Sequence, residues 1–292
     1  MTEEAQSSDP GGGGGLESFG GRQVHWVHQP GAAPPVVLLG GCGVPSFTWD
    51  AVVALLPGVE VARIDRPGMA GSSWPGVLPR LADEVGTLAD LIHRLGRPAV
   101  VVGHSMGGLH AEALARAHPG LVTGLVLVDS SVEWKQKRPG PQALWLASAR
   151  AARRVLAVPP LQPLGSLADR ILTAGQSGRG LFEPRSEQSK QAFRDPVAVA
   201  SVIAEQAAYG QQVQDLAELR ERLPFPEIEV VVLTAAGDGG RQWVADQARL
   251  ARLLRGRQVV SQQSRHLMMI DQPDLVHEAV TSVRQQGAPS DG

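Results

Sequence analysis

Short apolar runs alternate with longer amphipathic stretches along most of the chain. The runs are rich in Val, Ile and Leu, which predicts strands buried on both faces; they are Pro35–Leu39, Val59–Ile64, Ala99–Val102, Leu121–Val128, Glu229–Thr234 and Gln258–Ser261. Helical patterns separate them at Thr48–Leu56, Leu78–Leu95, Met106–Ala117, Arg241–Leu254 and Pro273–Arg284. This alternation predicts an α/β fold with a doubly wound, mostly parallel sheet, and ligands are expected at the carboxyl ends of its strands.

The alternation is interrupted once, between residues 131 and 223. No strong strand pattern occurs there, and helical patterns, prolines and glycine-rich turns follow one another. We therefore expect a helical cap or lid at 131–223, inserted into a core made of residues 16–130 and 224–286. The ends of the chain, 1–15 and 287–292, have few residues to bury, which predicts disordered tails.

Composition narrows the class of protein. With 292 residues and 43% hydrophobic content, the chain can form one large domain with an insertion. A formal net charge of −2 argues against a nucleic-acid partner, and no run of about 18 apolar residues predicts a transmembrane segment. There is no signal-peptide pattern, and the single cysteine, Cys42, cannot form an internal disulfide. These features predict a cytoplasmic protein, and they leave its oligomeric state open.

A serine framed by glycines ends the third predicted strand, in the stretch VVVGHSMGG at 100–108. The pattern G-x-S-x-G is weak alone, but here it joins a buried strand directly to a helix. A sharp turn at that point needs glycines two residues before and after the serine, which Gly103 and Gly107 supply. It would hold the Ser105 hydroxyl at the carboxyl edge of the sheet and leave the Met106 N–H free for an oxyanion.

A serine hydroxyl needs a base and a carboxylate that orients the base. His266 follows the last predicted strand and precedes the last helix, so it is the candidate base, whereas His104 and His110 are expected to point away from the nucleophile or along the helix. For the acid, Asp238 ends a strand and gives the chain order Ser105, Asp238, His266. Asp129 also ends a strand and is the alternative acid.

These segments together resemble the α/β-hydrolase superfamily, in particular its bacterial single-domain serine hydrolases with a helical cap. The resemblance covers about residues 20–286 and is carried by VVLLGGCG, DRPGMAGSS, GHSMGG, the strand end at Asp238, and SRHLMMIDQPDLV. It implies a second oxyanion donor at the backbone N–H of Cys42, beside that of Met106. The common His-Gly pair of this family is Gly40-Gly41 here, which raises the question of what holds the oxyanion loop.

The resemblance and the elbow serine together indicate acyl transfer. We expect an ester or similar acyl bond to be cleaved through an acyl-enzyme on Ser105, with His266 as base and then acid. Alternatives on the same residues are a C–C bond hydrolase, a lyase or a cofactor-free oxygenase. A non-catalytic ligand-binding protein of the same fold is a further alternative, although binding alone does not require all three polar residues.

The insertion is expected to select a small-molecule acyl substrate. Candidate pocket residues are Gly41, Trp134, Trp145 and Phe182, although Trp side chains in a cap also serve its own packing. A basic stretch, which could be a solvated face or could attract anionic substrates or membranes, comprises Lys135, Lys137, Arg138, Arg150, Arg153 and Arg154. Neither metal-ligand spacing nor a phosphate-binding loop is present in the sequence, so no cofactor is predicted.

Overall fold

The computed structural model of the protein describes residues 13–134, 140–178, 187–237 and 239–287. Within these residues, eight strands form one sheet in the order β1-β2-β4-β3-β5-β6-β7-β8. β2 pairs antiparallel with β1 and β4, and the remaining neighbours pair in parallel. The strands are β1 (Gly13–Phe19), β2 (Arg22–Gln29), β3 (Ala32–Leu39), β4 (Val59–Ile64), β5 (Ala99–His104), β6 (Val122–Val128), β7 (Glu229–Ala235) and β8 (Arg257–Ser261).

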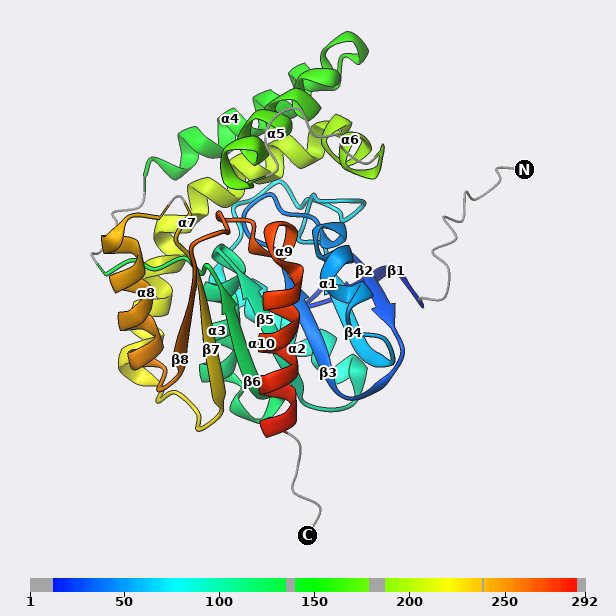
Figure 1. The fold of residues 1–292 in the computed structure, drawn as a ribbon. Coiled ribbons are helices and arrows are strands. Elements are labelled where there is room, and N and C mark those ends of the chain that lie inside the picture. Colours follow the sequence, from blue (N-terminus) through cyan, green and yellow to red (C-terminus); the bar gives the residue numbers. More distant parts are fainter. Residues whose placement is uncertain (1–12, 135–139, 179–186, 238, 288–292) are drawn as a thin grey trace.

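Helices cover both faces of this sheet (Figure 1). The core helices are α1 (Asp50–Ala54), α2 (Leu81–Leu95), α3 (Met106–Ala117), α8 (Arg241–Leu253), α9 (Met268–Asp271) and α10 (Pro273–Gly287), with short 3₁₀ turns η1 (Ser46–Trp49) and η2 (Pro119–Leu121). Successive strand residues point to opposite faces, so Val36 packs with α1 and α10 in one apolar cluster while Val37 packs with α2 and α3 in the other. This two-sided burial explains the unbroken apolar runs of the sequence.

The predicted fold class is confirmed, and each predicted strand is present. The two strands β1 and β2 were not among those predictions. Mixtures of polar and apolar residues such as RQVHWVHQ in β2 suit a half-exposed antiparallel edge and lack a continuous apolar run. The predicted N-terminal tail at 1–15 is too long, because β1 begins at Gly13. Gly13, Gly14 and Gly15 pair with His28, Val27 and Trp26 through the main chain, which requires no side chain to bury.

The insertion between β6 and β7 is helical. It contains α4 (Gln142–Leu156), η3 (Pro159–Leu161), α5 (Pro163–Gln176), α6 (Glu187–Arg194) and α7 (Pro196–Arg222). Asp195 caps α7 by accepting a hydrogen bond from the Val197 N–H at 2.8 Å, and Pro196 occupies the first turn, where its missing N–H costs nothing. α4 packs on α7, and Figure 1 shows these helices above one end of the sheet. α7 therefore lies between the outer insertion helices and the core.

Candidate active site

Ser105 lies at a strained turn between β5 and α3. Its backbone has φ +51° and ψ −122°, a conformation that side-chain-bearing residues rarely adopt. A Cβ atom on Gly103 would lie 2.5 Å from the Gly107 carbonyl oxygen, and one on Gly107 would lie 2.6 Å from that of Gly40. The turn thus requires glycine at both positions, which supports the sequence-based interpretation of this motif.

Two backbone N–H groups near Ser105 are candidate oxyanion donors. Met106 is the first residue of α3, so its N–H lies at the positive end of the helix dipole. Cys42 follows Gly41, where an added Cβ would lie 2.8 Å from Ser105 Cβ. Among the described residues, neither the Cys42 nor the Met106 N–H donates a hydrogen bond within the protein. Both donors are therefore available to a substrate oxygen.

His266 is brought to the same sheet edge by the loop between β8 and α9. Its Nδ1 lies 2.6 Å from Asp129 Oδ2, at the end of β6. Because a carboxylate oxygen accepts, this contact places the imidazole proton on Nδ1 and leaves Nε2 as the basic nitrogen. The His266 side chain is about one quarter exposed, while Asp129 is buried. The pair has the arrangement of a base and the acid that orients it.

Asp129 is held in this position by two further donors. Its Oδ1 accepts from the Ala235 N–H at 3.0 Å and from Trp243 Nε1 at 2.7 Å. The sequence favoured Asp238 as the acid and kept Asp129 as the alternative; Asp238 lies outside the described residues. The geometry favours Asp129, because the single proton on His266 Nδ1 is already donated to it. Trp243, in α8, was missed because its indole reaches the site from a separate helix.

His104 contacts His266 directly, contrary to the expectation that it points away from the site. Its Nε2 donates to the His266 carbonyl at 3.0 Å, and the two rings lie 4.6 Å apart between centroids. Burial, followed by the proximity of His266, holds the pKa of His104 well below its usual range, so it is neutral. Its Nδ1 is buried without a partner. The residue before the elbow serine thus supports the loop that carries His266.

The thiol of Cys42 is not a nucleophile in this environment. Burial raises its pKa, and the nearby Glu205 carboxylate raises it further. The Sγ atom lies 3.8 Å from the Val202 carbonyl in α7, to which it donates a weak hydrogen bond. Cys42 therefore contributes packing against α7, and its backbone N–H stays a candidate oxyanion donor.

The DRPG segment after β4 organises the oxyanion loop, which we define as residues 40–43. Asp65 accepts from the Ser46 N–H and from the Ser46 hydroxyl, both at 2.7 Å, and thereby fixes the chain just beyond the loop. Arg66 donates to the Gly40 carbonyl at 2.6 Å and also to that of Gly41. The DRPG motif was recognisable from the sequence, but its side chains had no predicted role.

The predicted pocket residues do not all gather at the site. Gly41 contacts the nucleophile turn, whereas Trp134 packs against the cluster on the α2 and α3 side, with Arg249 4.0 Å from its ring centroid. Trp145 is 45% exposed on α4, and Phe182 lies outside the described residues. In the predicted basic stretch, the three arginines of α4 are exposed, and the remaining members (Lys135, Lys137 and Arg138) lie outside the described residues.

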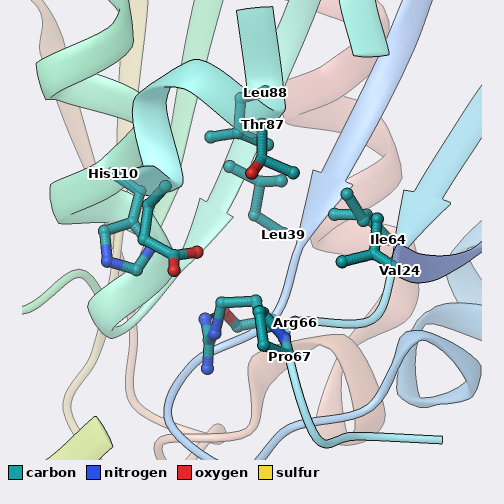
Figure 2. Close-up of a pocket in the computed structure, with 10 residues that line it drawn as sticks. Val24, Leu39, Ile64, Arg66, Pro67, Thr87, Leu88 and His110 are labelled. Atoms are coloured by element: carbon teal, nitrogen blue, oxygen red, sulfur yellow. Dashed lines mark hydrogen bonds between the residues drawn. The ribbon is translucent and has the colours of Figure 1, made fainter. Parts of the chain in front are cut away.

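A small cavity of about 10 Å³ adjoins the oxyanion loop at Gly40 (Figure 2). Its lining includes Leu39, Gly40, Arg66 and His110 but neither Ser105 nor His266. Figure 2 shows His110 on the left of the cavity and Val24 and Ile64 on its right, with Arg66 below and between them. This space is therefore separate from the nucleophile. In the described part of the chain, no group of three or more His, Cys, Asp or Glu side chains could hold a metal ion, and no helix could span a membrane.

The fold and this site define the class of protein. A family model described as "Alpha/beta hydrolase family" matches residues 36–279, so the chain belongs to that family. The solved structure of Cfl2 from Burkholderia cenocepacia superposes with a TM-score of 0.71 at 18% identity, covering 95% of this chain and 98% of that one. At this identity the likeness shows a shared fold.

Curated relatives match parts of the chain. It is 43% identical over 103 residues to Esterase Rv0045c of Mycobacterium tuberculosis, which covers 34% of each chain. It is 32% identical over 165 residues to Lipase LipV of the same organism, covering 52% of this chain and 62% of the lipase. The chain thus matches about a third of the esterase and less than two thirds of the lipase.

Proposed function

We propose that this protein is a serine hydrolase that cleaves a carboxylic ester through an acyl-enzyme on Ser105. The observation that carries the proposal is the contact between His266 Nδ1 and Asp129 Oδ2 at 2.6 Å, on the sheet edge where the Ser105 turn lies. The esterase and lipase among its relatives support the same reaction class. Asp129 takes the role of the acid in this proposal, and Met106 and Cys42 supply the oxyanion donors.

The reaction follows from these roles. His266 Nε2 accepts the Ser105 hydroxyl proton as the serine oxygen attacks the ester carbonyl, and Asp129 stabilises the resulting imidazolium. The Cys42 and Met106 N–H groups bind the oxyanion, and the proton then passes from His266 to the departing alcohol. Water, deprotonated by the same histidine, releases the acid and restores Ser105.

Hydrolysis of a p-nitrophenyl ester series from acetate to laurate tests this proposal. We expect turnover by the wild-type protein and a loss of several powers of ten in kcat for both Ser105→Ala and His266→Ala. The preferred acyl length would report the size of the substrate pocket. Folded wild-type protein with no turnover on any ester and no labelling by a fluorophosphonate would overturn the proposal and favour a non-catalytic ligand-binding role.

A further inference from the structure

Arg66 connects the oxyanion loop to the helical insertion. On the loop side it donates to the carbonyls of Gly40 and Gly41. On the insertion side its Nε and Nη2 donate to the two carboxylate oxygens of Glu205, at 2.8 and 3.0 Å. Glu205 lies in α7, 139 residues further along the chain. One guanidinium thus uses its planar array of donors to hold two elements from distant parts of the sequence.

Glu205 also contacts the loop directly. Its Oε2 accepts from the Gly43 N–H at 2.9 Å. Two neighbouring residues of α7 also lie close to core glycines. A Cβ added to Gly43 would be 2.8 Å from Val202 Cγ2, and one added to Gly68 would be 2.4 Å from Ser201 Cβ. Side chains of α7 therefore pack closely on the oxyanion loop at Gly43 and on the segment after β4 at Gly68, and neither glycine has room for a larger side chain.

The ion pair between Arg66 and Glu205 is buried, so each charge is stabilised mainly by the other rather than by water. Arg66 is 10% exposed and Glu205 is 5% exposed at the side chain. Burial alone would lower the pKa of Arg66, but the adjoining Glu205 carboxylate more than offsets this, and the pKa is raised. Removing either charge would leave the other buried and unpaired, which is strongly unfavourable.

The peptide group links this pair to the oxyanion donors. In a planar trans peptide, the carbonyl of one residue and the N–H of the next point in opposite directions. Fixing the Gly41 carbonyl on Arg66 therefore fixes the direction of the Cys42 N–H, which is one of the two candidate donors. Gly40, whose carbonyl Arg66 also holds, has no side chain of its own with which to anchor the oxyanion loop.

We propose that Arg66 and Glu205 are positioning residues through which α7 orients the oxyanion loop, so that the hole is fully formed only when the insertion is seated on the core. This inference rests on the proposed function. A displacement of α7 that separates Glu205 from Arg66 would remove the carboxylate that orients the guanidinium. The Gly41 carbonyl would then be held mainly by the Val44 N–H, at 3.1 Å, and the Cys42 N–H would be less firmly directed. Opening of the insertion would thus be coupled to transition-state stabilisation as well as to substrate entry.

The test compares Glu205→Gln with Arg220→Gln. Arg220 is a matched control because it also ties α7 to the core through a buried pair, donating to Glu112 in α3 at 2.6 and 2.8 Å. For Glu205→Gln we expect kcat on a p-nitrophenyl ester to fall about a hundredfold, as for the loss of one oxyanion donor. KM should stay within about threefold, because the ground-state carbonyl needs this donor less than the oxyanion does.

A boronic acid that forms a tetrahedral adduct on Ser105 gives a second readout. Its inhibition constant should rise with the fall in kcat for Glu205→Gln, whereas Arg220→Gln should change stability while keeping kcat and boronate affinity near the wild-type values. Arg66→Lys keeps the charge but replaces the three guanidinium nitrogens that hold Gly40, Gly41 and Glu205 with a single ammonium nitrogen. It should also lower kcat at unchanged KM, and it provides the test if the Glu205→Gln variant does not fold.

The outcomes separate the two proposals. Wild-type protein that neither turns over esters nor reacts with a fluorophosphonate would overturn the proposed function. An active wild type whose Glu205→Gln and Arg66→Lys variants match Arg220→Gln in kcat and boronate affinity would overturn the positioning role alone. Parallel losses in kcat and boronate affinity, confined to the Arg66 and Glu205 variants, are the supporting result.

Discussion

His266 Nδ1 lies 2.6 Å from Asp129 Oδ2, although the two residues are 137 positions apart in the sequence. Asp129 itself adopts φ +43° where β6 ends, and Ala235 and Trp243 donate to its other oxygen. With Oδ1 fully engaged, only Oδ2 is directed at the imidazole. The carboxylate therefore determines which nitrogen of His266 carries the proton.

This relationship predicts that Asp129→Asn will be severely impaired. Because Ala235 and Trp243 donate to the inner oxygen, the asparagine carbonyl would take that place and its NH₂ would face His266 Nδ1. The imidazole proton would then move to Nε2, and we expect kcat to fall about 10⁴-fold, as in other serine triads with this change. Ester hydrolysis by the purified variant measures the loss.

Asp238→Asn is the matched comparison, since Asp238 is the acid that the sequence favoured. We expect its kcat to remain close to the wild-type value. A large loss in Asp238→Asn with normal turnover in Asp129→Asn would reverse the assignment.

His104 leads to a second prediction. Replacing it with leucine removes the Nε2 donor to the His266 carbonyl, so the loop that presents the base becomes less fixed. We expect kcat to fall between about tenfold and a hundredfold, since small misplacements of catalytic groups have effects of this size. His104→Gln, whose amide can donate in a similar direction, should recover part of the loss. Equal kcat values in the leucine variant and the wild type would contradict this role.

The chemistry at each strand end was predictable from sequence because it depends on local order. Apolar runs located the strands, and strand ends located Ser105, His266 and both candidate acids. Which acid reaches His266 depends on the turn after β6, and sequence spacing does not determine that geometry. The donors from His104 and Trp243 were missed for the same reason, because each acts on a residue brought near only by the fold.

The pairing of Arg66 with Glu205 was even less predictable from the sequence than the contacts of His104 and Trp243. DRPG is recognisable as a motif, but Glu205 is one of several polar residues on a helix that is mostly apolar or alanine-rich. Nothing in its spacing distinguishes it from a solvent-facing residue. Its burial follows from the packing of α7 on the core, a tertiary feature. Helices α4 to α7 lie in the predicted insertion, and its role as a cap stays a prediction. The contact between α7 and the oxyanion loop could be found only from the structure.

Gly41 yields a third prediction, based on close packing. An added Cβ would lie 2.8 Å from both Ser105 Cβ and His104 Nδ1, so Gly41→Ala must displace the oxyanion loop or the nucleophile turn. We expect kcat/KM to fall about a hundredfold, because a shift of this size misplaces the reacting groups. The thermal midpoint should change much less than activity, since the collision is confined to one turn.

Gly86→Ala is the control for Gly41→Ala. Gly86 lies inside α2 with nothing within 4 Å of an added Cβ, so alanine there should stabilise the helix by about 0.5–1 kcal/mol without affecting turnover. Thermal unfolding and ester hydrolysis of both variants make the comparison. Normal kcat/KM in Gly41→Ala would show that the loop can move without consequence for catalysis.

The last prediction concerns stability at mildly acidic pH and the buried imidazole of His110. Its Nε2 lies 2.8 Å from Gln212 Oε1 and donates to it, and burial, aided by the positive charge of Arg66, lowers the pKa of His110. In the unfolded chain the His110 imidazole titrates near the ordinary histidine pKa of about 6.5. Just below that pH, the unfolded chain therefore binds a proton at this residue that the folded protein does not bind. Stability therefore rises with pH through this window and falls as the pH is lowered.

His110→Leu should make that pH dependence shallower. The free energy of unfolding, from urea titrations at pH 7.5 and 5.5, should fall less between these conditions for the variant than for the wild type. The variant is expected to be less stable overall, because Gln212 Oε1 loses its donor, so the difference between the two pH values is the informative quantity. The lowered pKa of Glu84 acts in the same direction but at more acidic pH, near carboxyl titration. Identical differences in the two proteins would mean that His110 does not contribute to the acid sensitivity.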